Sequence, residues 1–272
     1  MSAAAEFRAM HGSGCFILPN PWDAGSAVYL QRLGFRALAT TSAGFAFTRA
    51  LPDTADALLL EAVLANVKEI VEAVPLPVNA DFQSGYAEDL ETLSVNVTRC
   101  VRTGAAGLSI EDATGNVAAP LYELTRAVER VRAARAAIEK TGIPVVLTAR
   151  CESWLVGDRD PLRTALARLT AYADAGADCL YAPGVRDPGM IAEIVKAVAP
   201  KPVNVLVSTP VPGLSRSRLE DLGVRRISVG SALSRVAWQA FARAARSIAE
   251  TGSFDALGDA IPFSELNGIF SP

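Results

Sequence analysis

The sequence predicts a (β/α)8 barrel, the TIM-barrel fold class, from three observations. Eight short apolar segments recur along the 272 residues, and each follows a Gly or Pro of the kind that ends a helix. Amphipathic segments with apolar residues at helical spacing separate them. No linker-like change in composition divides the chain, so we expect one α/β domain over residues 1–272, with 254–272 as a C-terminal helical extension. A doubly wound open sheet is the main alternative, but the glycine-rich dinucleotide fingerprint is absent after the first strand.

The predicted strands are short, apolar and rich in β-branched residues, which is typical of strands buried on both faces. In chain order they lie in CFILPN (15–20), LGFRALATTS (33–42), VPLPVNADF (74–82), TGAAGLSIED (103–112), TGIPVVLTAR (141–150), AGADCLYAPG (175–184), APKPVNVLVS (199–208) and LGVRRISVG (222–230). The clearest predicted helices between them cover 56–74, 124–142 and 160–176. The apolar residues of the 254–272 extension are expected to pack on the barrel or on a neighbouring subunit.

Composition excludes several classes of function. With 29 acidic and 26 basic residues the formal charge is −3, so the chain lacks the broad positive field on which nucleic-acid binding depends. No stretch approaches the roughly 18 apolar residues of a membrane helix, and the chain does not open on a basic segment followed by an apolar run. Four cysteines without paired spacing suggest neither a disulfide framework nor a metal site. We expect a cytoplasmic protein that binds neither nucleic acid nor a membrane.

Two residue types are scarce, and each scarcity argues against a mechanism. The only histidine is His11, before the first predicted strand, which disfavours a Ser/His/Asp triad or a multi-histidine metal site. The only lysines are Lys68, Lys140, Lys196 and Lys201, in predicted helices or in segments that enter strands. Active sites of such barrels form at the carboxyl ends of the strands, so no lysine is placed to form a Schiff base.

Polar residues end most of the predicted strands, and their chemistry is that of oxygen ligands and one arginine. Asp81 and Glu111, on adjacent strands, can hold a hard cation such as Mg²⁺, and Gln83 can add a neutral oxygen. Arg150, one strand further on, offers a planar fork for a substrate carboxylate. The full set of strand-end polar residues is Asn20, Asp23, Thr41, Ser42, Asp81, Gln83, Glu111, Asp112, Arg150, Glu152, Ser208, Thr209 and Ser231.

Each of these signals also has a purely structural interpretation. A strand-end aspartate can cap the next turn or helix, and Arg150 with Glu152 can form a structural ion pair. Cys151 alternates away from its neighbours and is expected to pack in the core. Gly230–Ser231 can bind phosphate at a helix N-terminus or serve as an ordinary N-cap. Because four neighbouring strands end in such residues, we favour a functional site.

Taken together, the motifs resemble the isocitrate lyase and phosphoenolpyruvate mutase superfamily over roughly residues 15–250. The resemblance rests on NPWDAGSA at the first strand, TTSAG and LPD after the second, ADFQSGY at the third, SIED at the fourth and TARCE at the fifth. It implies a barrel that assembles as a dimer or tetramer by exchange of the eighth helix. It also implies Mg²⁺ as cofactor and a small 2-oxo or dicarboxylic acid as substrate.

Carried over by position, the resemblance assigns roles to individual residues. It implies that Asp81 and Glu111 belong to the metal site and that Arg150 binds a substrate carboxylate or phosphonate. Asp53 resembles the aspartate near the metal and the reacting centre. The backbone amides of Ser42, Ala43 and Gly44 resemble a segment that holds the substrate carboxylate, and Asn20 is a further candidate for substrate binding.

The sequence departs from the family at two places. Gln83 stands where many members have a second aspartate, which removes one negative charge from the metal site. The loop after Asp112 reads ATGNVAAPLY and lacks the Lys-Lys-Cys-Gly-His type segment of the isocitrate and methylisocitrate lyases and the Lys and Asn of the mutases. We therefore expect neither isocitrate lyase nor mutase activity. Asp53 or Tyr122 is a candidate for handling a proton.

These residues lead to one main hypothesis and two alternatives. The first is a Mg²⁺-dependent lyase or decarboxylase that cleaves a C–C bond in a small 2-oxo or 2-hydroxy acid of the oxaloacetate or substituted malate type. The second is a phosphonopyruvate hydrolase that cleaves a C–P bond at the same site. The third is a catalytically weak protein that binds a 2-oxo acid such as 2-oxoglutarate or oxaloacetate.

Overall fold

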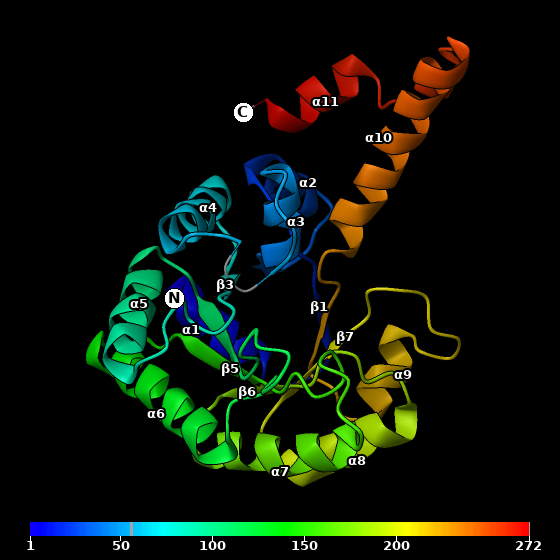
Figure 1. The fold of residues 1–272 in the computed structure, drawn as a ribbon. Helices are drawn as coiled ribbons and strands as arrows, with labels where there is room; N and C mark the ends of the chain where they lie inside the picture. Colours follow the sequence, from blue (N-terminus) through cyan, green and yellow to red (C-terminus); the bar gives the residue numbers. More distant parts are fainter. Residues whose placement is uncertain (55–56, 272) are drawn as a thin grey trace.

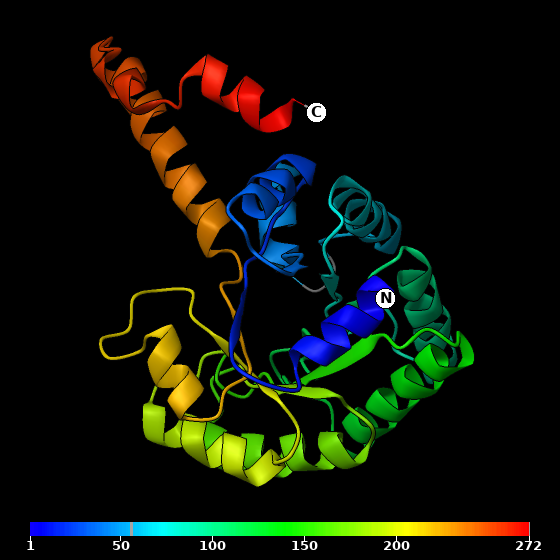
Figure 2. The ribbon, with the colours of Figure 1, turned by 180° about the vertical axis from the view of Figure 1, so that it is seen from behind.

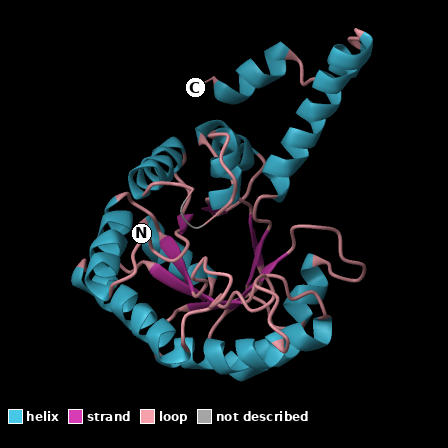
Figure 3. Cartoon of the chain, in the orientation of Figure 1, coloured by secondary structure: helices cyan, strands magenta, loops and turns pink. Residues whose placement is uncertain are grey.

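Eight parallel strands form a barrel that helices surround, as the sequence predicts (Figures 1 and 3). The structure is a computed structural model, and it describes residues 1–54 and 57–271. Neighbouring strands pair in the order β1-β8-β7-β6-β5-β4-β3-β2, and the Ala39 amide donates to the Pro19 carbonyl (3.0 Å) between the two end strands. The strands are β1 (Phe16–Leu18), β2 (Leu38–Ala39), β3 (Val78–Asp81), β4 (Gly107–Glu111), β5 (Val146–Arg150), β6 (Cys179–Tyr181), β7 (Val203–Leu206) and β8 (Arg226–Ser228).

The helices follow the strands, and many begin at an acidic or hydroxyl N-cap. Asp23, Asp89, Asp160 and Asp187 each accept a hydrogen bond from a backbone amide in the first turn of the following helix. The predicted helix over 56–74 is observed from Leu60, and residues 55–56 lie outside the described part of the chain. The outer helices are α2 (Ala24–Arg32), α4 (Leu60–Ala73), α5 (Leu90–Arg102), α6 (Leu124–Lys140), α7 (Pro161–Asp174), α8 (Pro188–Val198), α9 (Arg216–Asp221) and α10 (Ala232–Thr251).

Two short helices were not expected from the sequence. Helix α1 (Ala3–Met10) lies across the end of the barrel at which the strands begin (Figure 2), where Phe7 is fully buried and Arg8 pairs with Asp178 (2.8 Å). Helix α3 (Ser42–Thr48) follows β2 directly and is capped by Thr41. Both are only two turns long, so tertiary contacts rather than helical periodicity stabilise them.

The apolar core fills the space between strands and helices, whereas much of the barrel interior is polar. Asn79, Thr148, Asn204 and Arg226 are all buried. The Arg226 guanidinium donates to Asn204 Oδ1 and to Thr148 Oγ1, each at 2.9 Å, so these side chains meet inside the barrel. Barrel interiors are more commonly filled by branched apolar side chains. The polar interior here continues a cavity that opens at the carboxyl ends of the strands.

The C-terminal segment leaves the barrel and turns back toward it (Figures 1 and 2). Helix α10 projects away from the strands, and a 3-10 helix η1 (Asp255–Asp259) and helix α11 (Phe263–Phe270) follow it. The end of α11 reaches α2, where Arg32 donates to the Ser271 carbonyl (3.0 Å). Within the described chain, none of the helices combines the length and apolar character needed to span a membrane.

Candidate active site

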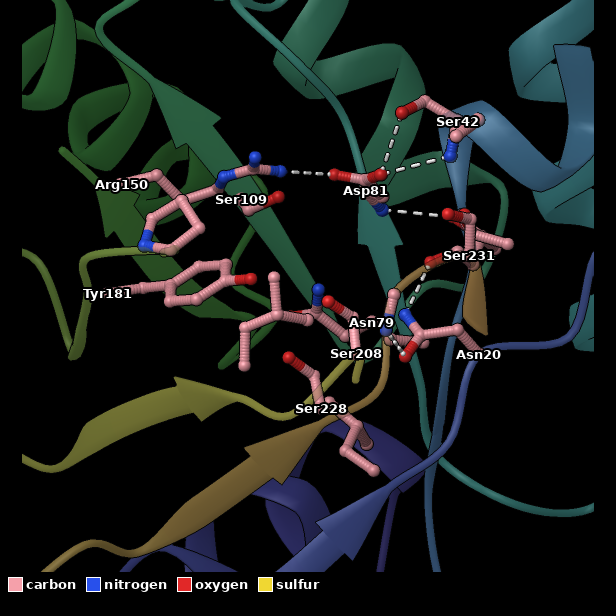
Figure 4. A pocket seen from close by; sticks show the side chains of 18 of the residues that line it. Asn20, Ser42, Asn79, Asp81, Ser109, Arg150, Tyr181, Ser208, Ser228 and Ser231 are labelled. Atoms are coloured by element: carbon pink, nitrogen blue, oxygen red, sulfur yellow. Dashed lines mark hydrogen bonds and ion pairs between the residues drawn. The ribbon is translucent and has the colours of Figure 1, made fainter. Parts of the chain in front are cut away.

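A cavity of about 220 Å³ opens where the strands end, and most of the predicted site residues line it (Figure 4). The lining comes from all eight strands or from the loops that follow them. The sequence-predicted residues on the wall are Asn20, Ser42, Ala43, Asp53, Asp81 and Arg150. The site therefore lies at the end of the barrel at which TIM-barrel enzymes place their chemistry.

Asp81, at the end of β3, is held between an arginine and a helix start. Its Oδ1 accepts a hydrogen bond from Arg150 Nη1 at 2.7 Å. Its Oδ2 accepts from both the amide and the hydroxyl of Ser42, each at 2.9 Å (Figure 4). Charge-assisted hydrogen bonds of this kind fix the carboxylate in one orientation. Asp81 is thus preorganised on the cavity wall, 69 residues away in sequence from its arginine partner.

Arg150, at the end of β5, is surrounded by carboxylates. Besides Asp81, its Nη2 lies 3.2 Å from Glu111 Oε2, and its Nε donates to Glu152 Oε1 at 2.9 Å. The guanidinium also stacks on the Tyr181 ring, 5.2 Å from its centroid. Burial disfavours the charged guanidinium, but Glu152, Glu111 and Asp81 more than offset this and hold the pKa of Arg150 well above its usual value.

A second set of interactions, centred on Asp112, holds Glu152 in place beside Arg150. Asp112 Oδ1 accepts from the Glu152 amide at 2.8 Å, and Asp112 Oδ2 accepts from the Tyr172 hydroxyl at 2.6 Å. Arg168 balances the Asp112 charge at 3.1 Å. Asp112 is therefore a positioning residue for Glu152, which in turn orients Arg150.

The electrostatics of the cluster are dominated by excess negative charge. One guanidinium faces Asp81, Glu111 and Glu152. Burial, aided by repulsion from Glu152 and Asp81 and opposed by Arg150, raises the pKa of Glu111 to about 8. Asp53 is exposed as a whole residue, but desolvation at the cavity wall and then repulsion from Asp81 raise its carboxyl pKa. The site thus has more acidic groups than its one arginine can neutralise.

This donor set fits a divalent cation of the Mg²⁺ type. Within residues 1–54 and 57–271, no group of three or more His, Cys, Asp or Glu side chains is arranged to hold a metal ion. Mg²⁺ is usually bound by one or two carboxylates together with waters and substrate oxygens, so a complete protein cage is not required. Burial raises the pKa values of Glu111 and Glu152, and such an ion would favour the charged forms of these carboxyl groups beside Asp81.

Gln83, a predicted metal ligand, is not on the cavity wall. It has a left-handed backbone (φ +43°), and its buried Oε1 has no hydrogen-bond partner among the described residues. The loop around it is fixed by Asn96, which donates to the carbonyls of Gly85 and Tyr86, both at 3.0 Å. Gln83 therefore lies beside the site with one unused oxygen, and the structure does not bring it into the cavity.

The other predicted binding residues fall into two groups. Asn20 lines the cavity and also joins three strand ends, because it donates to the Thr40 carbonyl and accepts from the amides of Val229 and Gly230 (2.8–3.0 Å). Ser42 and Ala43 line the cavity, but the Ser42 amide donates to Asp81 Oδ2 (2.9 Å), so it is engaged within the protein. Gly44 does not line the cavity, since its amide donates to Thr41 Oγ1 (3.2 Å) and its backbone packs closely on the Thr41 side chain.

Tyr122, a predicted candidate for handling a proton, is not on the cavity wall. Its hydroxyl donates to Glu88 Oε2 at 3.2 Å, and its ring stacks against Arg130 at 4.5 Å. The segment around it closes on itself through a bridge between Ala113 and Leu121. No residue of this loop lines the cavity. We therefore leave Tyr122 out of the proposed mechanism.

Sequence reasoning missed the residues that line the deeper part of the cavity. Asn79 and Ser109 precede the last residues of β3 and β4, and Arg226 begins β8, so a search of strand ends passes over these three. Tyr181 and Ser228 end β6 and β8 and were overlooked. A detectable signal was present in RRIS, where an arginine interrupts an otherwise apolar strand. The missed lining residues include Asn79, Ser109, Tyr181, Arg226 and Ser228.

Comparison with known proteins gives relatives along almost the whole chain. The sequence profile of the phosphoenolpyruvate phosphomutase family matches residues 7–249. An uncharacterized protein of Mycobacterium tuberculosis (strain H37Rv) is 31% identical over 96% of this chain and 94% of its own length. An oxaloacetate decarboxylase of Chromohalobacter salexigens is 31% identical over 84% of this chain and 78% of that protein.

Solved structures agree with these sequence relatives. A presumed lyase/mutase from Burkholderia cenocepacia J2315 is 45% identical and superposes with a TM-score of 0.94, covering 99% of this chain and 96% of that one. A 2,3-dimethylmalate lyase, a member of the PEP mutase/isocitrate lyase superfamily, is 25% identical with a TM-score of 0.88, covering 99% and 94%. With the family profile spanning its barrel and site, this chain belongs to the phosphoenolpyruvate mutase/isocitrate lyase superfamily.

Proposed function

We propose that this protein is a Mg²⁺-dependent lyase or decarboxylase that cleaves a C–C bond in a small 2-oxo or 2-hydroxy carboxylic acid of the oxaloacetate or substituted malate type. The observation that carries the proposal is the Asp81–Arg150 pair, 2.7 Å apart on the cavity wall and surrounded by further carboxylates. An oxaloacetate decarboxylase and a 2,3-dimethylmalate lyase among the relatives support the substrate class.

In this proposal Arg150 binds the substrate carboxylate. A guanidinium has five N–H donors, and contacts to Asp81, Glu111 and Glu152 engage three of them. The remaining donors can face a carboxylate in the cavity, and the three carboxylates hold the guanidinium plane in place. Bidentate recognition of this kind fixes orientation as well as charge.

Asp81 is the residue that would hold Mg²⁺, with Glu111 as its neighbour on the next strand. When bound, the ion supplies positive charge that stabilises an enolate as the C–C bond breaks. The orientation of Asp81 by Ser42 and Arg150 means that the carboxylate need not reorganise during the reaction.

Proton transfer is assigned to Asp53. Its carboxyl lines the cavity, and desolvation with repulsion from Asp81 raises its pKa, which brings it nearer to the range useful for general acid catalysis. In this proposal Asp53 delivers a proton to the carbon of the enolate after cleavage.

The test is turnover of oxaloacetate and of a substituted malate by the wild-type protein with and without Mg²⁺. Asp81→Asn and Arg150→Ala are each expected to lower kcat/KM by roughly 100-fold or more, because each removes a charge next to the reacting carboxylate. Arg159→Ala, an exposed arginine on the same loop after β5, is the matched control and should leave turnover unchanged. Unchanged turnover in both site variants would contradict the assignment.

A binding function without chemistry remains the second candidate, because no residue of the loop after Asp112 lines the cavity. Calorimetric titration with 2-oxoglutarate or oxaloacetate, beside the turnover assay, separates the two. Tight binding without turnover would favour this second candidate. Release of phosphate from phosphonopyruvate in the same assay would instead favour C–P bond hydrolysis.

We also propose that the protein assembles as a homo-oligomer through α10. This helix projects from the barrel with several large apolar side chains exposed, and the end of α11 returns to α2 (Figure 2).

A further inference from the structure

Arg226 is a buried cation that forms no ion pair with a carboxylate of residues 1–54 or 57–271. It lies on β8, inside the barrel, with 2% of its surface exposed. A buried charge without a counter-charge is costly, and proteins usually avoid one. The other arginine on the cavity wall, Arg150, faces three carboxylates.

Three neutral groups hold Arg226 in one orientation. Its Nε donates to Asn204 Oδ1 and its Nη2 to Thr148 Oγ1, both at 2.9 Å. Its Nη1 lies 3.3 Å from His11 Nε2, and His11 Nδ1 lies 2.7 Å from the Phe7 carbonyl, so the neutral imidazole donates to Phe7 and accepts from Arg226. Three donors are engaged, and two of the five remain for a ligand.

Arg226 lies deeper in the cavity than Arg150. Both line it, but Arg226 bonds to Thr148, which precedes Arg150 by two residues on β5. Two residues along a strand span about 6.6 Å, so the two guanidinium groups are separated by roughly one layer of side chains. The carboxylates of a short dicarboxylic acid can span such a gap.

The cavity wall carries a further unused polar group. Asn79 lines the cavity and is buried, and its Oδ1 has no hydrogen-bond partner among the described residues. Ser109 and Ser228 also line the cavity, and the Ser228 hydroxyl accepts from Asn204, the partner of Arg226. An arginine with two unused N–H donors and hydroxyl groups that can donate form a polar pocket suited to a carboxylate. The Asn79 oxygen can only accept, so it would bond to a hydroxyl group or water of the bound molecule and not to its carboxylate.

We infer that Arg226 binds the second, distal carboxylate of the substrate and so makes the site selective for 2-oxo diacids over 2-oxo monoacids. This inference rests on the proposed function, because it places the first carboxylate of the substrate at Arg150. It adds a specificity residue within the barrel that acts through charge and not through the reacting atoms.

The experiment compares the binding of 2-oxoglutarate and pyruvate by calorimetry in the presence of Mg²⁺. The wild-type protein should bind 2-oxoglutarate at least about 10-fold more tightly than pyruvate. Arg226→Gln should weaken 2-oxoglutarate binding by about 10- to 100-fold, the value of a charge-assisted contact, and should leave pyruvate binding within about 3-fold. Arg225→Gln, the neighbouring arginine, which bonds to the Gly14 carbonyl, is the matched control and should change neither.

Arg226→Lys distinguishes loss of the contact to the ligand from loss of the fold, because lysine keeps the positive charge but lacks the planar guanidinium group. It should retain a preference for the diacid, weaker than that of the wild-type protein. Equal affinity of the wild-type protein for the two acids, or an unchanged preference in Arg226→Gln, would overturn the inference and leave the proposed function intact. Absence of binding of either acid to the wild-type protein would overturn both.

Discussion

At the scale of single residues, His11 couples the stability of the barrel to pH. Burial, followed by the nearby charge of Arg226, lowers the pKa of His11 to about 3, from the ordinary value of 6.5. The unfolded chain therefore binds one proton more than the folded chain between these two pH values. The free energy of unfolding should rise with pH across this window and fall as the solution is acidified below about 6.5.

The expected contribution of His11 is a loss of roughly 2 kcal/mol at pH 5 relative to pH 8, from 1.36 kcal/mol per pH unit below the ordinary pKa. Urea denaturation at the two pH values measures it. In His11→Gln, which keeps a neutral side chain at both, the difference between pH 5 and pH 8 should be smaller by about this amount. The same pH dependence in both proteins would show that His11 is protonated in the folded state.

The residue scale also shows what the sequence could and could not predict about the site. Asp81 and Arg150 end strands of one parallel barrel, so their meeting at 2.7 Å follows from topology. Orientation within loops does not follow from topology. Tyr122 turns to Glu88, and the Gly44 amide is used by Thr41, because local partners compete with the cavity. Arg226 was missed because an inward-facing position of a buried strand is ordinarily apolar.

At the scale of elements, the order of strands and helices could be predicted because each strand–helix pair is long enough to show an apolar run followed by apolar residues at helical spacing. Helices α1 and α3 could not, since each is two turns long and held by tertiary contacts such as Arg8–Asp178. The loop between β3 and α5 is a third such case. Asn96 and Arg130 fix it through its backbone carbonyls, which no side-chain pattern reveals.

Gly85 makes that loop sensitive to substitution. Its φ is +80°, and an added Cβ would lie 2.2 Å from Leu93 Cδ1 and 3.3 Å from Ile110 Cδ1. Gly85→Ala therefore adds a steric clash to the strain of a left-handed backbone, and we expect it to lower the free energy of unfolding by about 2–4 kcal/mol. Gly142→Ala is the matched control, because φ is +70° there and nothing lies within 4 Å of the added Cβ.

Chemical denaturation of the two glycine variants separates strain from packing. Gly142→Ala should lower the free energy of unfolding only by the strain of a left-handed backbone, roughly 1 kcal/mol. Because the Gly85 loop directly follows Asp81, Gly85→Ala should also weaken binding of 2-oxo acids, whereas Gly142→Ala should not. Equal losses of stability in the two variants would mean that Leu93 moves aside without cost.

At the scale of the whole molecule, α10 is a long helix that exposes large apolar side chains. Phe241 is 63% exposed and Trp238 45% exposed, and their rings pack edge to face at 5.5 Å. A groove lined by Phe47, Leu51 and Trp238 lies near the start of the helix. Contiguous exposed apolar surface on a folded chain commonly marks an interface. We expect a second copy of the chain to cover this face.

Light scattering coupled to size-exclusion chromatography tests the assembly. The wild-type protein should have a mass of two or four chains, and the double variant Trp238→Glu with Phe241→Glu should have the mass of one, because burying two carboxylates in an apolar interface is unfavourable. Val117→Glu is the control, since Val117 is 95% exposed on the loop after β4 and well separated from α10 in sequence. A monomeric wild-type protein would contradict the proposal.

Because Ser231 on the cavity wall immediately precedes α10, dissociation should also weaken binding of 2-oxo acids.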